Sequence, residues 1–263
     1  MLMRSGVLVL MLLVAQEFPE RFLFLFDPAA NPEADEVFQV IADGLDSGNP
    51  RLQSIALTAM ASRPYLLMSE GFSEAGARGW LAERTLLQKL KPRVRALAEA
   101  PDRRVRREAL RAFAALDFRG DGDEWALQLG DETIALCAMR YRLEEDAWVR
   151  AEAVRVIGFD DSADAGEPTI AAALHDPDAG VVAAAILGVE EHRMSAELPR
   201  LAALLAHPSA HVRTPAAGVV STFGEAALPH LPDLERALAV EEDPVTADTM
   251  RESIAVLLGR SAA

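Results

Sequence analysis

A tight turn followed by an amphipathic helix occurs five times in this sequence. The turns end on an apolar residue at positions 52, 105, 149, 181 and 212, so the last two intervals are 32 and 31 residues and the earlier ones 53 and 44. Repeat periods of 20–50 residues are typical of solenoids. A single helix pair cannot bury its apolar face alone, so neighbouring pairs must stack on one another. The repeat therefore predicts a stack of helix pairs.

Within each repeat the apolar residues fall on one helical face. An alanine stands four residues after the residue that ends the turn, and a larger apolar residue stands eight residues after it. Positions i, i+4 and i+8 lie along one side of a helix, and an alanine between two larger residues indicates that two helices approach closely there. The predicted buried positions are Val105 and Ala109, Val149 and Ala153, Val181 and Ala185, and Val212 and Ala216, with Leu52, Ala56 and Met60 in the first repeat.

Another apolar-periodic segment precedes each of these helices, for example over residues 133–143, 168–174 and 198–205. Asp and Pro stand in the turns, where one helix must stop and the next must start. We predict an all-α fold, an α-solenoid of stacked antiparallel helix pairs with about six units over residues 33–258, and a tail over 259–263. Gly-rich insertions at 61–80 and 117–131 are either binding loops, as insertions in solenoids often are, or inert ones.

The turns resemble those of HEAT repeats, and in particular the short HEAT-like units of phycobilisome lyases. The resemblance rests on Asp176-Pro177-Asp178 with Val181 and Ala185, and on His207-Pro208 with Val212, Arg213 and Ala216. A Val-Arg pair also follows the turns at 105–106 and 149–150, whereas Val182 replaces the arginine in the unit between. The resemblance implies that Arg106, Arg150 and Arg213 each pair with a turn acid of the adjacent repeat. It also implies that a degenerate unit at Asp243-Pro244-Val245 closes the stack.

The first 15 residues have the layout of a secretory signal peptide. Arg4 precedes an apolar run over residues 7–15, which is too short to span a bilayer. Leu13 stands where a small residue is preferred before a cleavage site, so the alternative is a buried N-terminal helix. We expect export, for example to a periplasm, in preference to a cytoplasmic location, and no stable membrane span in the mature chain. Residues 16–32 form a separate N-terminal segment.

Catalytic motifs are absent from the sequence. There is no Gly-rich phosphate loop, no nucleophile-elbow serine and no His-Glu-x-x-His. Cys137 stands among apolar neighbours and is expected to be a small buried hydrophobe. The chain has no His-Glu dipeptide, which HEAT-like di-iron hydroxylases repeat, and its acidic clusters at 121–124 and 160–164 lack EF-hand spacing. We therefore expect no enzyme activity, no metal and no cofactor.

Charge is distributed very unevenly along the chain. The net charge is −15, yet residues 84–119 hold 11 basic residues against four acids. Such asymmetry indicates a surface that attracts an acidic partner, or that binds an acidic part of the same stack or of another copy. The candidate partner-binding residues are Lys89, Lys91, Arg93, Arg95, Arg103, Arg104, Arg107 and Arg111. A strongly acidic chain whose basic stretch lacks aromatic residues is not expected to bind nucleic acid, which also argues against a HEAT-like DNA glycosylase.

The expected function is therefore a non-catalytic HEAT-repeat scaffold or adaptor that binds a protein partner through its solenoid surface. The alternative is an accessory factor for chromophore attachment or for maturation of a partner protein, similar to the phycobilisome-lyase relatives. That role would require a pocket with an apolar lining. The sequence leaves the partner and the oligomeric state undetermined.

Overall fold

The computed structural model describes residues 33–68, 83–121, 124–127, 129–159 and 164–259, together with Phe22 and Leu25. The chain divides into two compact units, residues 1–127 and 128–263. The predicted signal peptide at 1–15, most of the segment at 16–32, the insertion beyond residue 68 and the last four residues lie outside the described part. No helix within the described ranges combines the length and apolar character needed to cross a bilayer.

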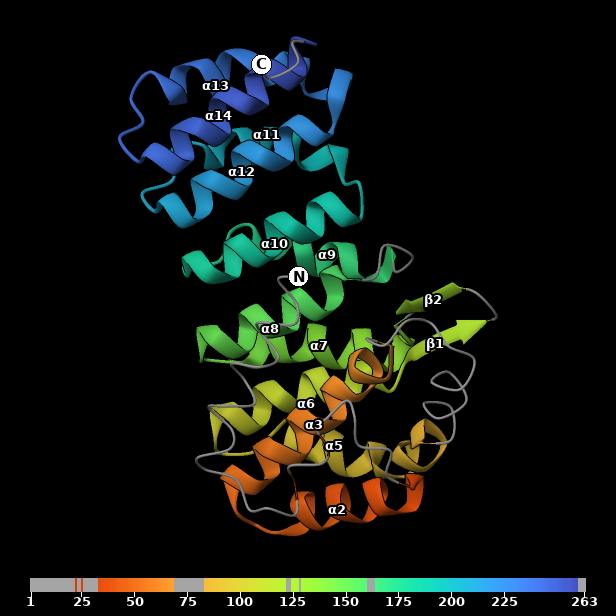
Figure 1. Cartoon of the computed structure of the whole chain (residues 1–263). Coiled ribbons are helices and arrows are strands. Elements are labelled where there is room, and N and C mark those ends of the chain that lie inside the picture. Colours follow the sequence, from red (N-terminus) through yellow and green to blue (C-terminus); the bar gives the residue numbers. More distant parts are fainter. Residues whose placement is uncertain are drawn as a thin grey trace. The chain divides into compact units, whose positions relative to one another are not determined.

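The first unit contains two helix pairs (Figure 1). Helix α2 (Ala34–Asp46) packs on α3 (Pro50–Met68), and the short η2 (Gln88–Leu90) and α5 (Lys91–Leu97) lead into α6 (Arg103–Ala115). Helix α5 packs on α6, and α6 packs in turn on α3, so the second helices of the two pairs are neighbours.

A two-stranded hairpin follows α6, inside the insertion predicted at 117–131. Strand β1 (Phe118–Asp121) pairs antiparallel with β2 (Glu124–Leu127), with Phe118 opposite Leu127 and Asp121 opposite Glu124. These are the only strands in the described ranges, so the all-α class is confirmed with one local exception. A loop was predicted for the insertion at 117–131, and the structure has a hairpin within it.

The second unit stacks four helix pairs (Figure 1). The pairs are α7 (Asp131–Leu143) with α8 (Ala147–Gly158), α9 (Glu167–Ala173) with α10 (Ala179–Glu191), α11 (Leu198–Leu204) with α12 (Ala210–Thr222), and α13 (Leu231–Leu238) with α14 (Pro244–Leu257). Short 3-10 turns η3 (Asp164–Gly166), η4 (Ser195–Glu197) and η5 (Gly224–His230) join successive pairs. Second helices pack on second helices, in the order α8, α10, α12, α14. The described residues thus contain six pairs, as predicted.

The starts of the helices follow from residue chemistry. The carboxylates of Asp102, Asp146, Asp178 and Asp243 accept backbone N–H groups from the first turn of α6, α8, α10 and α14. Such N-caps satisfy donors that have no partner inside the helix. Proline stands at the first or second position of α5, α9, α11 and α13, where its missing N–H costs nothing.

The predicted apolar rows form the core. Val105, Ala109, Val149, Ala153, Val181, Ala185, Val212 and Ala216 are all fully buried, as are Ala56 and Met60. Helices α8 and α10 approach so closely that a Cβ atom on Gly158 would lie 3.0 Å from the Cα atom of Gly188. Small residues beside these rows therefore allow the backbones of α8 and α10 to touch.

In the last pair the row of buried residues begins at Thr246, one residue after Val245. Asp243 caps α14 through the N–H of Thr246, which is the third residue after the cap, as in the other repeats. Thr246 and Met250 are fully buried, whereas Val245 is 64% exposed. The unit predicted as degenerate at Asp243-Pro244-Val245 therefore keeps buried residues at the repeat positions, with a threonine in place of the first apolar residue. The Thr246 hydroxyl is satisfied there by the Asp243 carboxylate at 2.7 Å.

We predict that Ala185→Leu destabilises the protein by about 1–3 kcal/mol, because a larger side chain between touching helices forces them apart. Leu187→Ala, two residues further along the same helix but half exposed, should change stability by less than about 0.5 kcal/mol. Urea denaturation of the two variants makes the comparison. Equal midpoints would show that Ala185 does not occupy a tight contact.

Candidate interaction surfaces

Cys137 is buried, as the sequence predicted, and is 1% exposed within α7. In the described part of the chain no group of three or more His, Cys, Asp or Glu side chains is arranged to hold a metal ion. The side chains of both acidic clusters lie outside that part.

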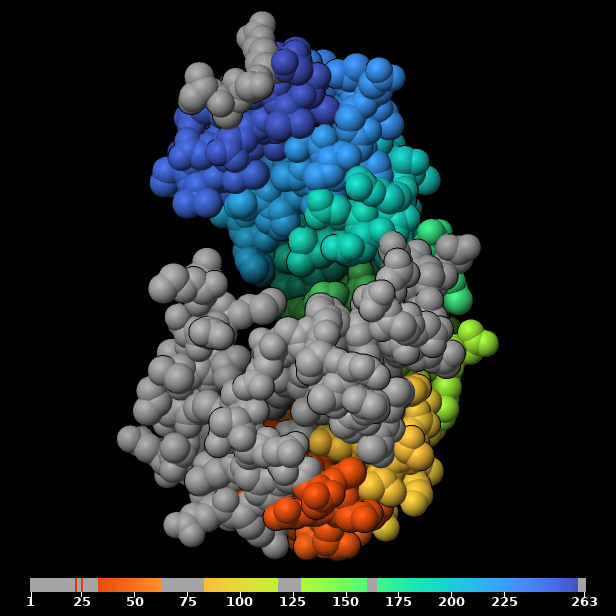
Figure 2. Space-filling view, turned by 45° about the vertical axis from the view of Figure 1, so that its right-hand side comes forward, coloured from red at the N-terminus to blue at the C-terminus, as the bar shows by residue number. Residues whose placement is uncertain are grey.

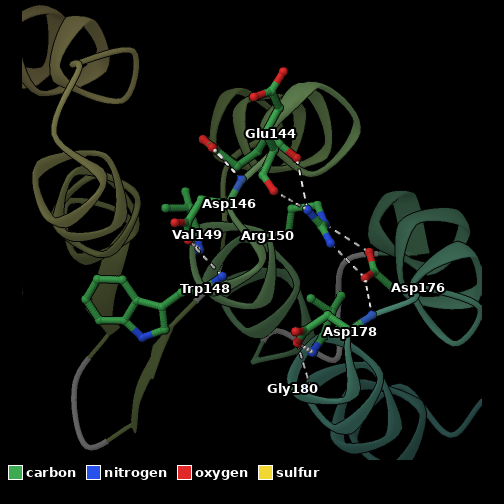
Figure 3. Close-up of polar contacts among 10 residues, drawn as sticks. Glu144, Asp146, Trp148, Val149, Arg150, Asp176, Asp178 and Gly180 are labelled. Carbon is green, nitrogen blue, oxygen red and sulfur yellow. Dashed lines mark hydrogen bonds and ion pairs between the residues drawn. The ribbon is translucent and has the colours of Figure 1, made fainter.

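Arg150 joins one repeat to the next (Figure 3). Its Nε and Nη2 donate to the two carboxylate oxygens of Asp176 at 3.0 and 2.9 Å, while Nη1 donates to the carbonyl oxygens of Glu144 and Glu145 at 3.2 and 2.9 Å. Asp176 also accepts the backbone N–H of Asp178, the residue that caps α10. One guanidinium thus contacts the turn of its own repeat and the acid that organises the next turn. We call this contact the Arg–acid bridge.

The same bridge recurs two repeats later. Arg213 donates to both oxygens of Glu241 at 2.6 Å and to the carbonyls of His207 and Pro208 at 2.9 and 3.0 Å, and Glu241 accepts the N–H of Asp243. These hydrogen bonds, those from Arg213 above all, lower the pKa of Glu241 from 4.5 to about 2. The acids in turn raise the pKa of Arg150 and Arg213.

Where the arginine is missing, its acid is missing too. Val182 stands in place of the arginine on α10, and His207 stands in place of the acid in the following turn, where its Nδ1 accepts the N–H of Ser209 at 3.1 Å. In the first unit the two places are held by Gln53 and Ala100, and Gln53 donates to the carbonyl of Leu45. The bridge is therefore present or absent as a pair.

A groove of about 770 Å³ opens in the first unit where this bridge is lacking. Gln53 and Ala100 line it, together with residues of the two turns. At its edge Arg93 of α5 forms an ion pair with Asp46 of α2 at 2.9 Å, which links the two pairs from a different position. Both side chains are about half exposed, so this contact contributes little to stability.

The eight basic residues predicted as one surface are divided between η2 and α5 on one side of a turn and α6 on the other. Lys89, Arg93 and Arg95 are exposed on η2 and α5. Lys91 is half-buried, 3.5 Å from Asp117 and with its Nζ 4.6 Å from the centre of the Phe113 ring. Within this group, Lys91 and Arg93 therefore take part in contacts inside the first unit.

The other four arginines lie along one face of α6. Arg103, Arg107 and Arg111 are spaced four residues apart, and Arg104 stands beside them. Glu108, whose side chain is 8% exposed, accepts from Arg107 at 3.0 Å and from Arg111 at 3.1 Å. We call Arg103, Arg104, Arg107 and Arg111 the α6 arginine face.

A second groove, of about 470 Å³, lies in the second unit on α8, α10 and α12. Its lining residues are Arg155, Gly180, Ala183, Ala184, Leu187, Ala210, His211, Thr214 and Pro215. This groove was not predicted from the sequence. The feature that indicates it is the presence of small residues on α10 at positions where α8 has large ones: Gly180 corresponds to Trp148, and Ala184 corresponds to Glu152.

We predict that a missing bridge can be restored. Gln53→Arg combined with Ala100→Asp should show a favourable coupling of about 1 kcal/mol or more in a double-mutant cycle, because the charged pair would form across the groove with charge-assisted hydrogen bonds. Thermal denaturation of the two single variants and the double variant provides the cycle. Strict additivity would show that the turns are not placed for the bridge.

The existing bridge predicts a pH dependence. Because the pKa of Glu241 is lowered in the folded state, its stabilisation is fully present above the ordinary value of 4.5 and is lost as the pH falls toward 2. Glu241→Gln should cost about 1–2 kcal/mol at pH 7, and the difference from the natural protein should shrink steadily below pH 4.5. Urea denaturation at several pH values measures it, with Glu242→Gln, an exposed neighbour, as control. A pH-independent difference would contradict the assignment.

Residues 136–221 match the family model for HEAT repeats. No curated protein matches the sequence. Two engineered proteins of known structure are similar in fold. One has a TM-score of 0.53 and 15% identity, covering 87% of this chain and 100% of its own, and the other has 0.52 and 16%, covering 87% and 98%. The archaeal HEAT-like repeats protein from Thermococcus onnurineus NA1 is 14% identical, with a TM-score of 0.48, covering 87% of this chain and 98% of that one.

At these identities the structural similarity concerns the fold alone. These matches do not test the resemblance to phycobilisome lyases, which stays a prediction. The family match at 136–221 runs from within α7 to near the end of α12 and includes the Arg150 bridge. This part of the chain is therefore similar to HEAT repeats, and the fold of the described residues is an all-α solenoid of stacked helix pairs.

Proposed function

We propose that the protein is a non-catalytic HEAT-repeat scaffold that binds an acidic protein partner through the α6 arginine face. The observation that carries this proposal is the placement of four arginines along one side of α6, of which Arg107 and Arg111 contact the buried carboxylate of Glu108. Arginine is enriched at protein interfaces because its planar, weakly hydrated head group pairs well with carboxylates.

The electrostatic setting supports an acidic partner. The chain as a whole has a net charge of −15, so most of it repels an acidic partner and the cationic face is a local exception. Such a face attracts a partner whose negative charge is concentrated where the two surfaces meet, and it orients that partner during encounter. Arg103 and Arg104 are exposed and stand at the start of α6, where they contact solvent.

The non-catalytic part of the proposal is supported by where the perturbed groups lie. Active sites usually concentrate residues with shifted pKa values. Here the pKa shifts of Arg150, Arg213, Glu241 and Asp243 come from bridge or cap contacts, and the pKa of Tyr141 is raised by its burial and then by Asp176 of the bridge. These shifts are accounted for by the stacking of repeats.

The test is affinity capture from nuclease-treated lysate of the source organism, with the natural protein and with Arg103→Glu/Arg104→Glu as baits. We expect an acidic protein that the natural bait retains at about 50 mM salt, that is released at a few hundred millimolar, and that the variant loses. Arg236→Glu/Arg251→Glu, which changes two exposed arginines of α13 and α14 by the same charge, is the control and should retain the partner.

Retention of the same partner by the α6 variant would contradict the proposal, and so would equal loss in both variants. Circular dichroism of each bait confirms that the helical fold is intact. The chromophore-related alternative requires a pocket with an apolar lining, which the larger groove does not offer, because its lining includes the charged Asp46 and Arg93.

A further inference from the structure

The groove on α8, α10 and α12 has features that the stacking of repeats does not explain. Its floor is made of small residues, since Gly180, Ala183 and Ala184 lie on one face of α10. Leu187 continues that face and is half exposed beside the groove of about 470 Å³. An aliphatic side chain from another molecule would bury Leu187 and fill the space over the alanines.

A buried carboxylate holds an arginine at the groove edge. Glu152 is 3% exposed as a residue, and its carboxylate accepts from Nη1 of Arg155 at 2.5 Å. The Arg155 side chain is 40% exposed and lines the groove. A guanidinium has five N–H donors, so one that is anchored through Nη1 still presents others to a ligand. The fixed geometry lowers the entropic cost of binding a carboxylate.

The opposite wall offers a hydrogen-bond acceptor. Pro215 lies inside α12 and has no backbone N–H, so the helical hydrogen bond to the carbonyl of His211 cannot form. Both residues line the groove. Thr214, by contrast, returns its hydroxyl to the carbonyl of Ala210 at 2.9 Å. The carbonyl of His211 therefore lacks the helical donor that a residue other than proline would supply at position 215.

The groove differs in charge from the rest of its unit. Residues 128–263 contain 23 acidic against ten basic residues, whereas the described residues that line the groove include Arg155 and His211 and no acid. Glu152, the ion-pair partner of Arg155, is itself buried. A ligand with a carboxylate would be repelled by most of this unit and accepted here. Charge complementarity therefore selects an acidic occupant.

We propose that this groove binds an extended acidic segment of a partner protein, with an aliphatic side chain two positions before an acidic one. Seven helical residues separate Gly180 from Leu187, a rise of about 10 Å, which equals about three residues of extended chain. Alternate side chains of such a segment point to the same side. The aliphatic one fills the space above Ala183 and Ala184, the acidic one pairs with Arg155, and a backbone N–H donates to His211. This site is separate from the α6 arginine face.

The experiment uses the full chain and three fluorescein-labelled nine-residue peptides. The first alternates serine with leucine and glutamate, so that leucine and glutamate stand two positions apart, and the others carry glutamine or lysine in place of glutamate. Fluorescence anisotropy should show saturable binding of the glutamate peptide below about 1 mM and at least tenfold weaker binding of the other two. Amide NMR shifts should change at Gly180, Ala183 and Leu187.

Two variants locate the site, each with a matched control. Leu187→Glu should weaken the glutamate peptide at least tenfold, whereas Val256→Glu, which adds the same charge at an exposed valine of α14, should change affinity less than twofold. Arg155→Gln should weaken it about tenfold, whereas Arg251→Gln, which also removes an arginine paired three residues away with an acid of its own helix, should not.

Equal binding of the lysine and glutamate peptides would overturn the proposal, as would unchanged affinity in Leu187→Glu or the absence of binding at 1 mM. Because Leu187 is half exposed, that variant is expected to fold, and an unchanged urea midpoint verifies it. The α6 variant Arg103→Glu/Arg104→Glu should bind the peptide normally. Failure of the proposal on the α6 arginine face therefore leaves this result unaffected.

Discussion

Where it is present, the Arg–acid bridge ties one helix pair to the next through their turns. A single arginine caps the carbonyls of the turn before its own helix, and its carboxylate partner accepts the N–H of the aspartate that caps the following second helix. Three contacts are thereby linked through one pair of side chains, Arg150 and Asp176. The apolar rows provide the free energy of association, and the bridge adds directional hydrogen bonds between two successive turns.

The energetics of the bridge explain its paired loss. Placing a carboxylate with a 2%-exposed side chain at Glu241 costs desolvation, which the two short hydrogen bonds from Arg213 and the backbone N–H of Asp243 offset. Removing only one partner would leave a charge without its counterpart. Replacing both is close to neutral, and the chain does so with Val182 and His207. The valine is 2% exposed and adds apolar burial, while the histidine still accepts the backbone N–H that the acid would have taken.

The sequence predicted the fold well where a residue's role depends only on its place in a helix. The buried rows and the helix pairs followed from spacing, and the family resemblance implied the bridges at Arg150 and Arg213. The hairpin at 118–127 was not predicted, because its pairing depends on contacts outside any period. The displacement from Val245 to Thr246 was missed because an apolar side chain was expected, whereas a cap three residues earlier sets the buried position.

The surfaces were harder to predict for a related reason. Adjacent basic residues in sequence were treated as one patch, but the turn between α5 and α6 divides them between antiparallel helices, where Lys91 and Arg93 contact acids of their own unit. The groove in the second unit depends on what is absent from α10, and small residues in a repeat also serve close packing. Only the half-exposed Leu187 beside them distinguishes the two uses.

A comparison of repeats shows how such a fold acquires different binding surfaces. Glu108 and Glu152 occupy the same place in their helices, three residues after the buried valine, and each holds an arginine one turn further on. On α6 this glutamate–arginine ion pair lies among other arginines, whereas on α8 it borders an apolar groove. The buried rows and bridges restrict one side of each second helix. The opposite side carries none of these constraints, so its residues can change with little effect on stacking. Binding specificity in this chain is therefore expected to reside at those positions, and each repeat can contribute a different chemical group without altering the fold.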